Sequence, residues 1–432
     1  MYITIRKRSD IMIKNSLLLI FTAIITSAVV VSFLNFCQIA VDQFRILAES
    51  IWWLPFVWTP LLTVLIVYVT LKYAPGTAGS GNQQIKAALD NRCDSVTRSK
   101  FVSLKVAIFK YFSTAAGFFA GLSIGREGPT VQIASSLMHS IRGFFPAGSK
   151  FTSNFLIGVG GAIGIAVAFK AVIAGTVFAL EECSKDIMKN SRVMFFTLVT
   201  FAIITCYALE GTNPFYAMVS FPQLTIIDAL PIIITTVFGA SLGGLFAKAL
   251  LFSMPNKKTI LGRFKGDHPL ILAGILGLVI AVIGIMFGGM TYSDGYIYTK
   301  GLVTGDGEFS YWFVPMKFIA TWFTAWTGVP AGMFSPLLSI GAGIGQAIAN
   351  LLIVDPKILV LCGMASFLSG VIRAPLTSGF LAVEVIGAHG LIPLALLVSL
   401  LSDKISSMIS KPLWLTQRDV LLFNSISRKE TK

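Results

Sequence analysis

Charged side chains are scarce in this sequence, and their scarcity excludes an ordinary water-soluble domain. Asp, Glu, Lys and Arg make up 12% of the 432 residues, whereas hydrophobic residues make up 55%. Soluble domains carry about 25% charged residues, so most of this protein's surface must face something other than water. The composition therefore predicts a protein that is embedded in a lipid bilayer.

Cysteine and histidine are too few and too scattered to form a metal or redox centre. They stand singly, without the spacing of a zinc site or a disulfide framework. Isolated buried thiols are the simplest interpretation of such cysteines. The sequence therefore predicts no metal and no cofactor. The residues are Cys37, Cys93, Cys183, Cys206, Cys362, His139, His268 and His389.

Apolar runs long enough to cross a bilayer, about 20 residues as a helix, recur along the whole chain. The alternation of a membrane β-barrel is absent. The first run exceeds the apolar core of a signal peptide, so we interpret it as a membrane helix. The sequence thus predicts an all-α polytopic membrane protein. The runs are 16–37, 51–73, 101–122, 154–181, 193–208, 229–253, 269–290, 311–329, 357–370 and 379–402.

The basic residues, which give a formal charge of +14, are unevenly distributed. They precede the first run, fill the 254–268 loop and crowd the C-terminal end, whereas 209–227 has none. Loops rich in Lys and Arg lie in the cytoplasm. We therefore expect a multi-pass protein of the inner (plasma) membrane with both termini in the cytoplasm, and no nucleic-acid partner. The 254–268 loop carries Lys257, Lys258, Arg263 and Lys265.

A weak internal repeat recurs at an offset of about 205 residues, a signal typical of transporters. FKAVIAGTVFALE at 169–181 matches IRAPLTSGFLAVE at 372–384, with Glu181 opposite Glu384. We expect one domain over the whole chain. Its expected parts are a first repeat at 1–208, a second repeat at 209–432, and within the latter a short cytoplasmic tail at 415–432 that is too small for a regulatory domain.

Three Gly-rich segments interrupt the apolar runs and then open a helix: AGSGNQQ at 78–84, GREGPTVQ at 125–132 and GMFSPLLS at 332–339. A helix that begins inside a membrane leaves its first N–H groups unpaired, with about half a positive charge behind them. Such ends are tolerated where they meet at a polar cavity, and together they would bind an anion. Partial charges suit transport, because a full Lys or Arg charge holds an ion too tightly for release. The alternative is that the segments are merely broken helices or surface loops.

The residue types in these segments fit that interpretation. Glycines allow tight turns and close approach of the backbone to an ion, while Pro129 and Pro336 stand where a missing N–H costs nothing. The Ser80 hydroxyl adds one hydrogen-bond donor.

In this order the segments resemble the three anion-site signatures of the CLC family of chloride channels and chloride/proton antiporters. The family patterns GSGIP, GREGP and GxFxP appear here as GSGNQ, GREGP and GMFSP, and LEE at 180–182 and IRAPLT at 372–377 extend the resemblance over nearly the whole chain. It implies two inverted repeats of tilted and broken helices, re-entrant helix N-termini that form an anion site, and a homodimer with one pore per subunit.

The resemblance also assigns roles to individual residues. It implies that Ser80 coordinates the anion, together with the backbone N–H groups of Met333 and Phe334. Lys110 resembles a buried lysine that raises the potential near the pore, with snorkelling to the interface as the alternative. The other expected binding or supporting residues are Gly79, Gly81, Gly125, Arg126, Gly128, Pro129, Gly332 and Pro336.

Two glutamates are the candidates for proton coupling. Glu127 resembles the family's gating glutamate: an ionised carboxylate competes for a site at helix N-termini, and a protonated one has no reason to stay. Its alternative is a structural pair with Arg126. Glu182 resembles the inner proton-transfer glutamate of many exchangers, and its alternative is a solvated carboxylate beside Lys185 at a helix end.

Two departures from the family pattern leave details open. GSGIP has become GSGNQ, so the turn after Gly81 is polar and is expected to be held differently. The tyrosine that supplies an inner hydroxyl in many relatives is matched by Trp414, whose indole N–H donates one hydrogen bond and accepts none. The inner gate and the strength of coupling therefore stay open.

The function that the resemblance implies is chloride/proton antiport, with chloride, protons and the lipid bilayer as partners. Ser80 points to chloride, because relatives specialised for nitrate or fluoride tend to replace it. A passive channel of the same fold, gated by voltage or protons, and an exchanger of another small anion remain alternatives. A membrane hydrolase using Glu127 and Glu182 is a further alternative, but no nucleophile motif or cofactor loop is present, so no enzyme is expected.

Overall fold

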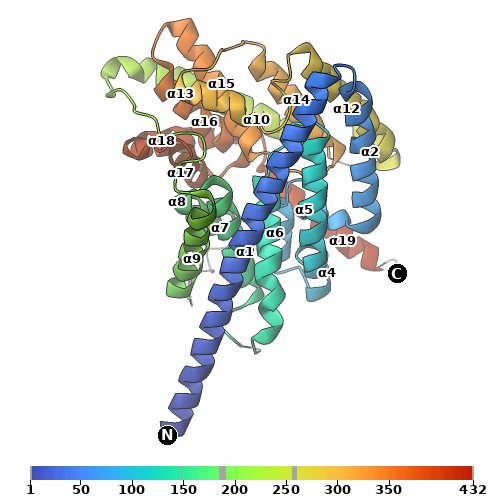
Figure 1. The fold of residues 1–432 in the computed structure, drawn as a ribbon, viewed down its shortest axis with the longest axis vertical. Coiled ribbons are helices and arrows are strands. Elements are labelled where there is room, and N and C mark those ends of the chain that lie inside the picture. Colours follow the sequence, from blue (N-terminus) through green and yellow to red (C-terminus); the bar gives the residue numbers. More distant parts are fainter. Residues whose placement is uncertain (1, 147, 184–190, 255–259, 431–432) are drawn as a thin grey trace.

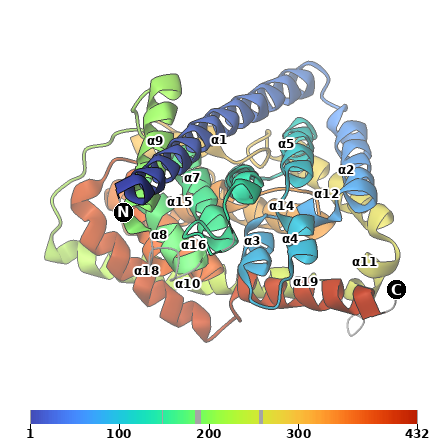
Figure 2. The same cartoon turned by 90° about the horizontal axis from the view of Figure 1, so that it is seen from below.

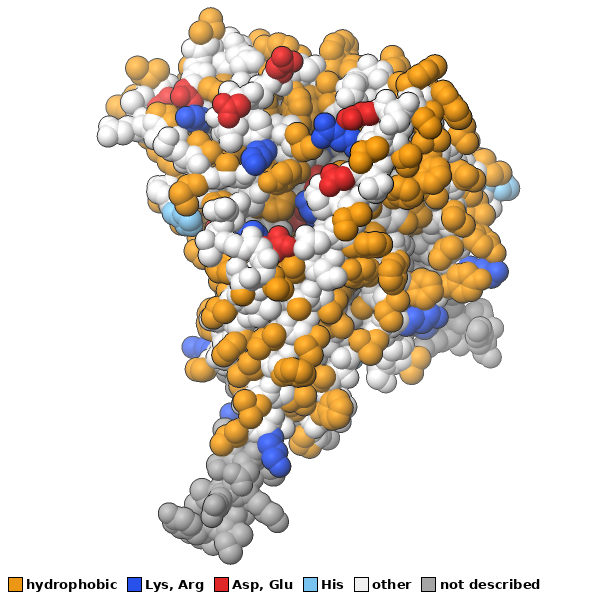
Figure 3. All heavy atoms as spheres, viewed as in Figure 1, with side chains coloured by type: hydrophobic (Ala, Val, Ile, Leu, Met, Phe, Trp, Pro, Cys, Tyr) orange, Lys and Arg blue, Asp and Glu red, His pale blue; other side chains and the backbone are white. Residues whose placement is uncertain are grey.

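The computed structural model describes residues 2–146, 148–183, 191–254 and 260–430. Within these ranges every regular element is a helix, and the β-type pairing is limited to one isolated bridge. Seven of the described helices are long and apolar enough to span a bilayer. They pack into one body (Figure 1), and hydrophobic side chains cover most of the face drawn in Figure 3. The prediction of an all-α polytopic membrane protein is confirmed.

The chain up to residue 210 forms the first group of helices (Figure 1). They are α1 (Tyr2–Ser50), α2 (Pro55–Tyr73), η1 (Pro75–Thr77), α3 (Asn82–Leu89), α4 (Ser95–Phe101), α5 (Leu104–Phe119), α6 (Glu127–Ser140), η2 (Ile141–Phe144), α7 (Ser153–Phe169), α8 (Val172–Phe178), the π-turn η3 (Ala179–Cys183) and α9 (Arg192–Glu210).

The rest of the chain forms the second group. It contains η4 (Ile226–Asp228), α10 (Ala229–Phe252), α11 (Ile260–Asp267), α12 (Pro269–Met286), α13 (Tyr296–Thr304), α14 (Phe313–Thr327), α15 (Phe334–Leu352), α16 (Pro356–Ile372), α17 (Pro375–Glu384), η5 (His389–Leu391), α18 (Ile392–Ser407) and α19 (Leu413–Glu430).

Two of the predicted apolar runs are broken rather than continuous. The run at 154–181 is divided where Lys170 takes a left-handed backbone conformation (φ 54°), which ends α7 before α8 begins. Arg373 ends α16 in the same way (φ 59°) just before α17. The run at 379–402 is divided between α17 and α18. Run length does not reveal such breaks, because the residues on both sides are equally apolar.

The C-terminal segment 415–432, expected as a polar tail, is mostly part of α19. This helix lies along α3 at one edge of the molecule (Figure 2). Arg92, in the α3–α4 connection, pairs with Asp419 at 2.9 Å, and Arg418 pairs with Asp90 at 3.4 Å. Hydrogen bonds from Arg92 lower the pKa of Asp90 to about 2, so this network stays charged at neutral pH.

The basic loop at 254–268 is described only in part. Lys257 and Lys258 lie outside the described residues, whereas Arg263 and Lys265 belong to α11.

Reciprocal contacts relate the two halves of the chain. The Gly125 N–H donates to the Gly332 carbonyl and the Gly332 N–H to the Gly125 carbonyl, both at 2.8 Å, in an antiparallel bridge. Ser123 Oγ and Thr321 Oγ1 are hydrogen-bonded at 2.8 Å close by. The pairing joins α5–α6 to α14–α15 as inverted copies. The expected boundary at 208/209 falls in the last turn of α9 and stays a prediction.

The repeated glutamates cap each other's helices. The Glu384 carboxylate accepts hydrogen bonds from the Ile173 and Ala174 N–H groups at the start of α8, at 3.1 and 2.7 Å. Glu181 does the same at the start of α17, where the Thr377 N–H is 2.8 Å away. Carboxylates stabilise helix N-termini through these hydrogen bonds and the helix dipole. The duplicated LEE and AVE segments are therefore a mutual clamp between the halves.

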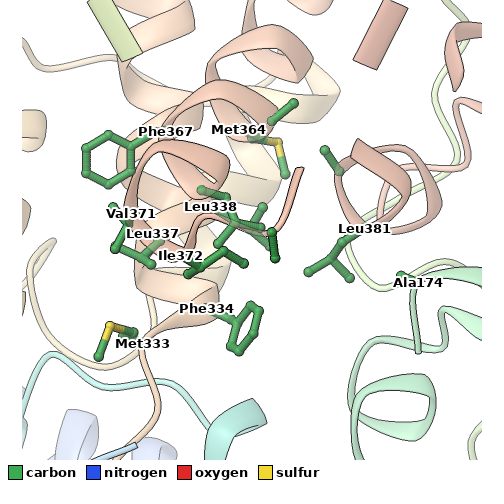
Figure 4. Close-up of a cluster of buried hydrophobic side chains, with 14 of the residues drawn as sticks. Ala174, Met333, Phe334, Leu337, Leu338, Met364, Phe367, Val371, Ile372 and Leu381 are labelled. Carbon is green, nitrogen blue, oxygen red and sulfur yellow. The ribbon is translucent and has the colours of Figure 1, made fainter. Parts of the chain in front are cut away.

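A dense apolar core fixes the start of α15. Figure 4 shows Phe334, Leu337 and Leu338 of α15 packed with Val371 and Ile372 of α16. Leu381 of α17 reaches the same cluster, and all of these side chains are buried. Because close-packed interiors resist small shifts, this packing holds the N-terminus of α15 in place.

Candidate anion-binding site

The Ser80 turn lies directly against the start of α6. A Cβ added at Gly128 would lie 2.5 Å from Ser80 Oγ, and one added at Gly81 would lie 2.6 Å from the Gly128 carbonyl oxygen. Gly81 also has a φ of 108°, which favours glycine. Ser80 is buried. The first two interrupted segments therefore share one buried point.

The start of α15 reaches the same point. A Cβ added at Gly332 would lie 2.9 Å from the Gly128 nitrogen, and Gly332 is bridged to Gly125. The first N–H groups of α6 and α15 lack partners within their own helices, and α3 begins two residues after Ser80. The structure thus brings together the three segments that the sequence singled out, so they are not separate surface loops.

Glu127 is the first residue of α6, and its side chain reaches the N-terminus of α15. Its carboxylate is fully buried and accepts hydrogen bonds from the Ser335 backbone N–H at 3.3 Å and from the Ser335 hydroxyl. It therefore takes a position that the helix dipole makes favourable for an anion. Arg126 instead pairs with Asp294 at 3.2 Å. The structure thus gives Arg126 another ion-pair partner, and the alternative of a structural Glu127–Arg126 pair is not tested by it.

Met333, Phe334 and Trp414 form the wall of the site on the α19 side. Met333 caps α15, Phe334 is its first residue (Figure 4), and Trp414 lies in the first turn of α19. The Phe334 and Trp414 ring centroids are 5.5 Å apart. Trp414 is 1% exposed, and its indole N–H has no acceptor among the described residues. An unpaired buried donor is costly, so this N–H is free for a ligand.

Asn82 is a residue of the site that sequence reasoning missed. Its side-chain amide donates a hydrogen bond to Ser80 Oγ at 3.1 Å. Because that oxygen is then occupied as an acceptor, the Ser80 hydroxyl hydrogen is free to be donated elsewhere. The departure from GSGIP to GSGNQ was the signal, since a polar side chain follows Gly81. Asn82 thus holds this turn, and whether relatives hold it differently stays a prediction.

Lys110 supports the Ser80 turn from α5. It is fully buried, and its ammonium donates hydrogen bonds to the Thr77 carbonyl at 2.8 Å and to the Gly79 carbonyl. Snorkelling to the interface is therefore wrong for this lysine. Its effect on the potential near the pore stays a prediction.

Lys317 of α14 is the counterpart of Lys110 in the second half of the chain. Its ammonium is also fully buried and donates to the Thr291 and Ser293 carbonyls at 3.0 and 2.7 Å. The two lysines thus stabilise backbone turns at matching places in the two halves.

Glu182 is paired with a residue that sequence reasoning missed. It lies in the π-turn η3, and its carboxylate is 2.9 Å from the Lys86 ammonium of α3. Both side chains are largely buried, with exposed fractions of 9% and 12%. A freely solvated Glu182 is therefore wrong, and its suggested neighbour Lys185 lies outside the described residues. The pair joins Glu182 to the helix that follows Ser80.

A cavity of about 230 Å³ opens beside Arg126. Lys170, Glu210 and Tyr296 line it as well. The Lys170 ammonium donates to the Glu210 carbonyl at 2.9 Å, so it is fixed at the rim. This charged hollow is a candidate for one mouth of an ion path.

The sequence profile described as "Voltage gated chloride channel" matches residues 62–407. This chain belongs to the voltage gated chloride channel family. Among the relatives within that family is the "H(+)/Cl(-) exchange transporter ClcA" of Vibrio parahaemolyticus, 25% identical over 347 residues that cover 77% of this chain and 72% of the relative. The protein of the same name from Vibrio vulnificus is 26% identical over 366 residues, with 80% and 75% covered.

Solved structures of this family share the fold. A slow cyanobacterial Cl−/H+ antiporter superposes with a TM-score of 0.79 at 22% identity, covering 94% of this chain and 97% of that one. A CLC-type fluoride/proton antiporter superposes with a TM-score of 0.75 at 23% identity, covering 91% and 95%. Both agree with the arrangement of broken helices described above.

Asn82→Leu tests whether Asn82 orients Ser80. Loss of one hydrogen bond of about 0.5–1.5 kcal/mol should weaken chloride binding by about three- to tenfold. Titration calorimetry on the detergent-solubilised protein measures this affinity. Asn350→Leu is the matched control, because Asn350 is exposed at the far end of α15. Equal affinities for both variants and the unaltered protein would show that Asn82 has no such role.

Proposed function

We propose that this protein exchanges chloride for protons across a membrane. The observation that carries the proposal is the Glu127 carboxylate at the N-terminus of α15, against the turn that carries Ser80. The family membership and the relatives named as H(+)/Cl(-) exchangers support it. These relatives are transporters, which favours transport over the hydrolase alternative.

In this proposal chloride and the Glu127 carboxylate compete for helix N-termini. Ser80 donates its hydroxyl hydrogen, Met333 and Phe334 donate backbone N–H groups, and the Trp414 indole adds the donor that a tyrosine supplies in many relatives. When Glu127 takes up a proton it loses the charge that α15 favours, so it leaves and an anion enters. One carboxylate thereby links the two movements. The glycines and prolines of the three interrupted segments shape the turns before the helices.

Glu182 is the second proton carrier in this proposal. The Lys86 ammonium, 2.9 Å away, holds the carboxylate in place without full exposure to water. The ion pair also joins the inner proton route to α3, which begins beside Ser80. Protonation of Glu182 would therefore affect the anion site through α3.

The proposed setting is the inner (plasma) membrane, with both termini in the cytoplasm. The distribution of Lys and Arg supports this orientation. The cavity beside Arg126 then opens to the outside, and the Lys86–Glu182 pair lies toward the cytoplasm.

Glu127→Gln separates exchange from passive conduction. Glutamine cannot ionise, so a chloride gradient across sealed vesicles should no longer drive protons, while chloride flux continues. A pH electrode and a chloride electrode record both fluxes from the same vesicles. Proton pumping by Glu127→Gln would remove Glu127 from the mechanism. If the unaltered protein moves chloride but no protons, the passive-channel alternative holds.

Glu182→Gln tests the inner proton route. We expect proton movement to be lost and chloride flux to remain, because the substitution removes none of the groups proposed to contact the anion. Lys86→Met, which removes only the counter-charge, should also slow proton movement without slowing chloride. The same vesicle assay applies, with Glu308→Gln in an exposed loop as the matched control. Unchanged coupling in Glu182→Gln would exclude this residue from the route.

We further propose that two copies form a homodimer with one pore in each. Helices α8 and α17 have seven and ten residues, so they are about 10 and 15 Å long in a hydrocarbon layer of about 30 Å. Neither helix can cross that layer alone, and in this proposal their carboxylate-capped ends lie within the bilayer. Ile173 and Leu376 at these ends are 40% and 41% exposed. Polar backbone at this depth needs protein cover, which a second copy would supply.

Ile173→Trp combined with Leu376→Trp should disrupt this dimer. Light scattering in detergent should give twice the chain mass of 46.6 kDa for the unaltered protein and a single chain for the variant. Leu61→Trp is the control, because Leu61 is 61% exposed on α2, away from this face. A single-chain mass for the unaltered protein would refute the dimer.

A further inference from the structure

A second cavity, of about 440 Å³, lies beside the end of α2. Its lining residues come from the end of α2, η1, the end of α4, the start of α5 and α19, and Figure 2 shows α4 and α19 on the same side of the molecule. Its volume falls within the range of about 300–1,000 Å³ that is usual for small-molecule sites. No part of the anion site lies in its lining. A ligand of this cavity would therefore differ from the anion bound beside Ser80.

The chemistry of the lining selects an anion. Lys100 and Lys105 line the cavity, and no acidic residue does. Neither ammonium forms an ion pair with any side chain that the structure describes. Hydroxyls of Ser99 and Ser103 and the phenol of Tyr73 add neutral polar groups. Two unpaired ammoniums with several hydroxyls suit a phosphate group.

The position of the cavity selects a lipid as the source of that phosphate. It begins where α2, a membrane-spanning helix, ends at Tyr73. Tyrosine and lysine at a helix end mark the level of the lipid headgroups. Lys72 lies at the same level, with its ammonium 5.3 Å from the Tyr73 ring centroid. The apolar side chains of Val106 and Leu421 in the lining suit the glycerol and upper acyl region.

We infer that this cavity binds the phosphate headgroup of an anionic phospholipid, on the side of the membrane that we propose is cytoplasmic. Basic pockets between membrane helices on that side are suited to such headgroups. The bound phosphate accepts hydrogen bonds from Lys100, Lys105 and the hydroxyls of Ser103 and Tyr73.

The walls of this cavity are connected to the anion site. The Gln132 side-chain amide of α6 donates to the Gly76 and Phe101 carbonyls, both at 3.0 Å, and both of these residues line the cavity. Gly76 belongs to η1, just before the Ser80 turn. Leu421 belongs to α19, which carries Trp414 in its first turn. A bound headgroup therefore stabilises the three elements that carry Ser80, Glu127 and Trp414, and it raises the transport rate.

Binding is tested with the full chain in a neutral detergent. Short-chain phosphatidylglycerol should raise the melting temperature, and phosphatidylcholine of the same chain length should not, because a ligand of the folded state stabilises it. Lys100→Gln with Lys105→Gln should weaken the response, by about fivefold in lipid concentration for each lysine removed. The double variant Lys100→Arg, Lys105→Arg, which keeps both positive charges, should respond to phosphatidylglycerol as the unaltered protein does.

The matched control is Lys404→Gln with Lys411→Gln. It removes the same charge from exposed lysines near the C-terminal end, outside the cavity lining. The control should respond to phosphatidylglycerol as the unaltered protein does. An equal loss of response in both double variants would show that only general surface charge matters, and it would overturn the proposal. A melting temperature of the unaltered protein that does not respond to phosphatidylglycerol would overturn it as well.

Flux measurements distinguish a lipid from a soluble phosphate compound. Chloride flux should be several-fold faster in vesicles that contain phosphatidylglycerol than in pure phosphatidylcholine, and the Lys100→Gln, Lys105→Gln variant should lose the difference. If glycerol phosphate added to phosphatidylcholine vesicles gives the same acceleration, the ligand is a soluble phosphate and the lipid assignment is wrong. Chloride flux is read directly, so the result does not depend on proton coupling.

Discussion

The structure depends on one constraint: backbone N–H groups at helix starts inside a bilayer must find a partner. Three helices begin at one buried point, where Gly81, Gly128 and Gly332 let the backbones approach. The antiparallel bridge between Gly125 and Gly332 pairs the backbone just before two of these helices, and the Glu127 carboxylate accepts from the Ser335 N–H. The rest are available to an anion. In the proposed mechanism, anion binding thus follows from incomplete satisfaction of the backbone N–H groups, which a rigid apolar core holds in place.

The positively charged side chains near the anion site have other partners. Lys110 and Lys317 are fully buried, yet both donate to backbone carbonyls at turns rather than pointing at the anion site. Arg126 is engaged by Asp294, and Lys86 by Glu182. An anion at the helix starts therefore meets partial charges and hydroxyls, which bind it without holding it permanently. In the proposed site the charged residues position the backbone, and the backbone N–H groups bind the anion.

Much of this arrangement could be predicted from the sequence. Composition and run length gave the membrane class, and the order of GSGNQ, GREGP and GMFSP located the three helix starts. Lys317 was also within reach: it stands 15 residues before Gly332, as Lys110 stands 15 residues before Gly125. The break at Lys170 was not, because apolar residues flank it on both sides.

Contacts between segments that are far apart in the sequence could not be predicted either. Lys86 and Glu182 are neighbours only because α3 packs against η3, and no local pattern links two charges separated by so many residues. The hydrogen bond from Asn82 to Ser80 is local, but a polar residue after a turn has many possible partners. Sequence therefore locates the helix starts well and the ion pairs between helices poorly.

The position of the anion itself tests this account most directly. Crystals grown with bromide in place of chloride, measured at the bromine absorption edge, locate the halide by its anomalous scattering. The account predicts a peak within hydrogen-bonding distance of the first N–H groups of α15 and of Ser80 Oγ. A halide bound beside lysine or arginine side chains, with none at these helix starts, would contradict it.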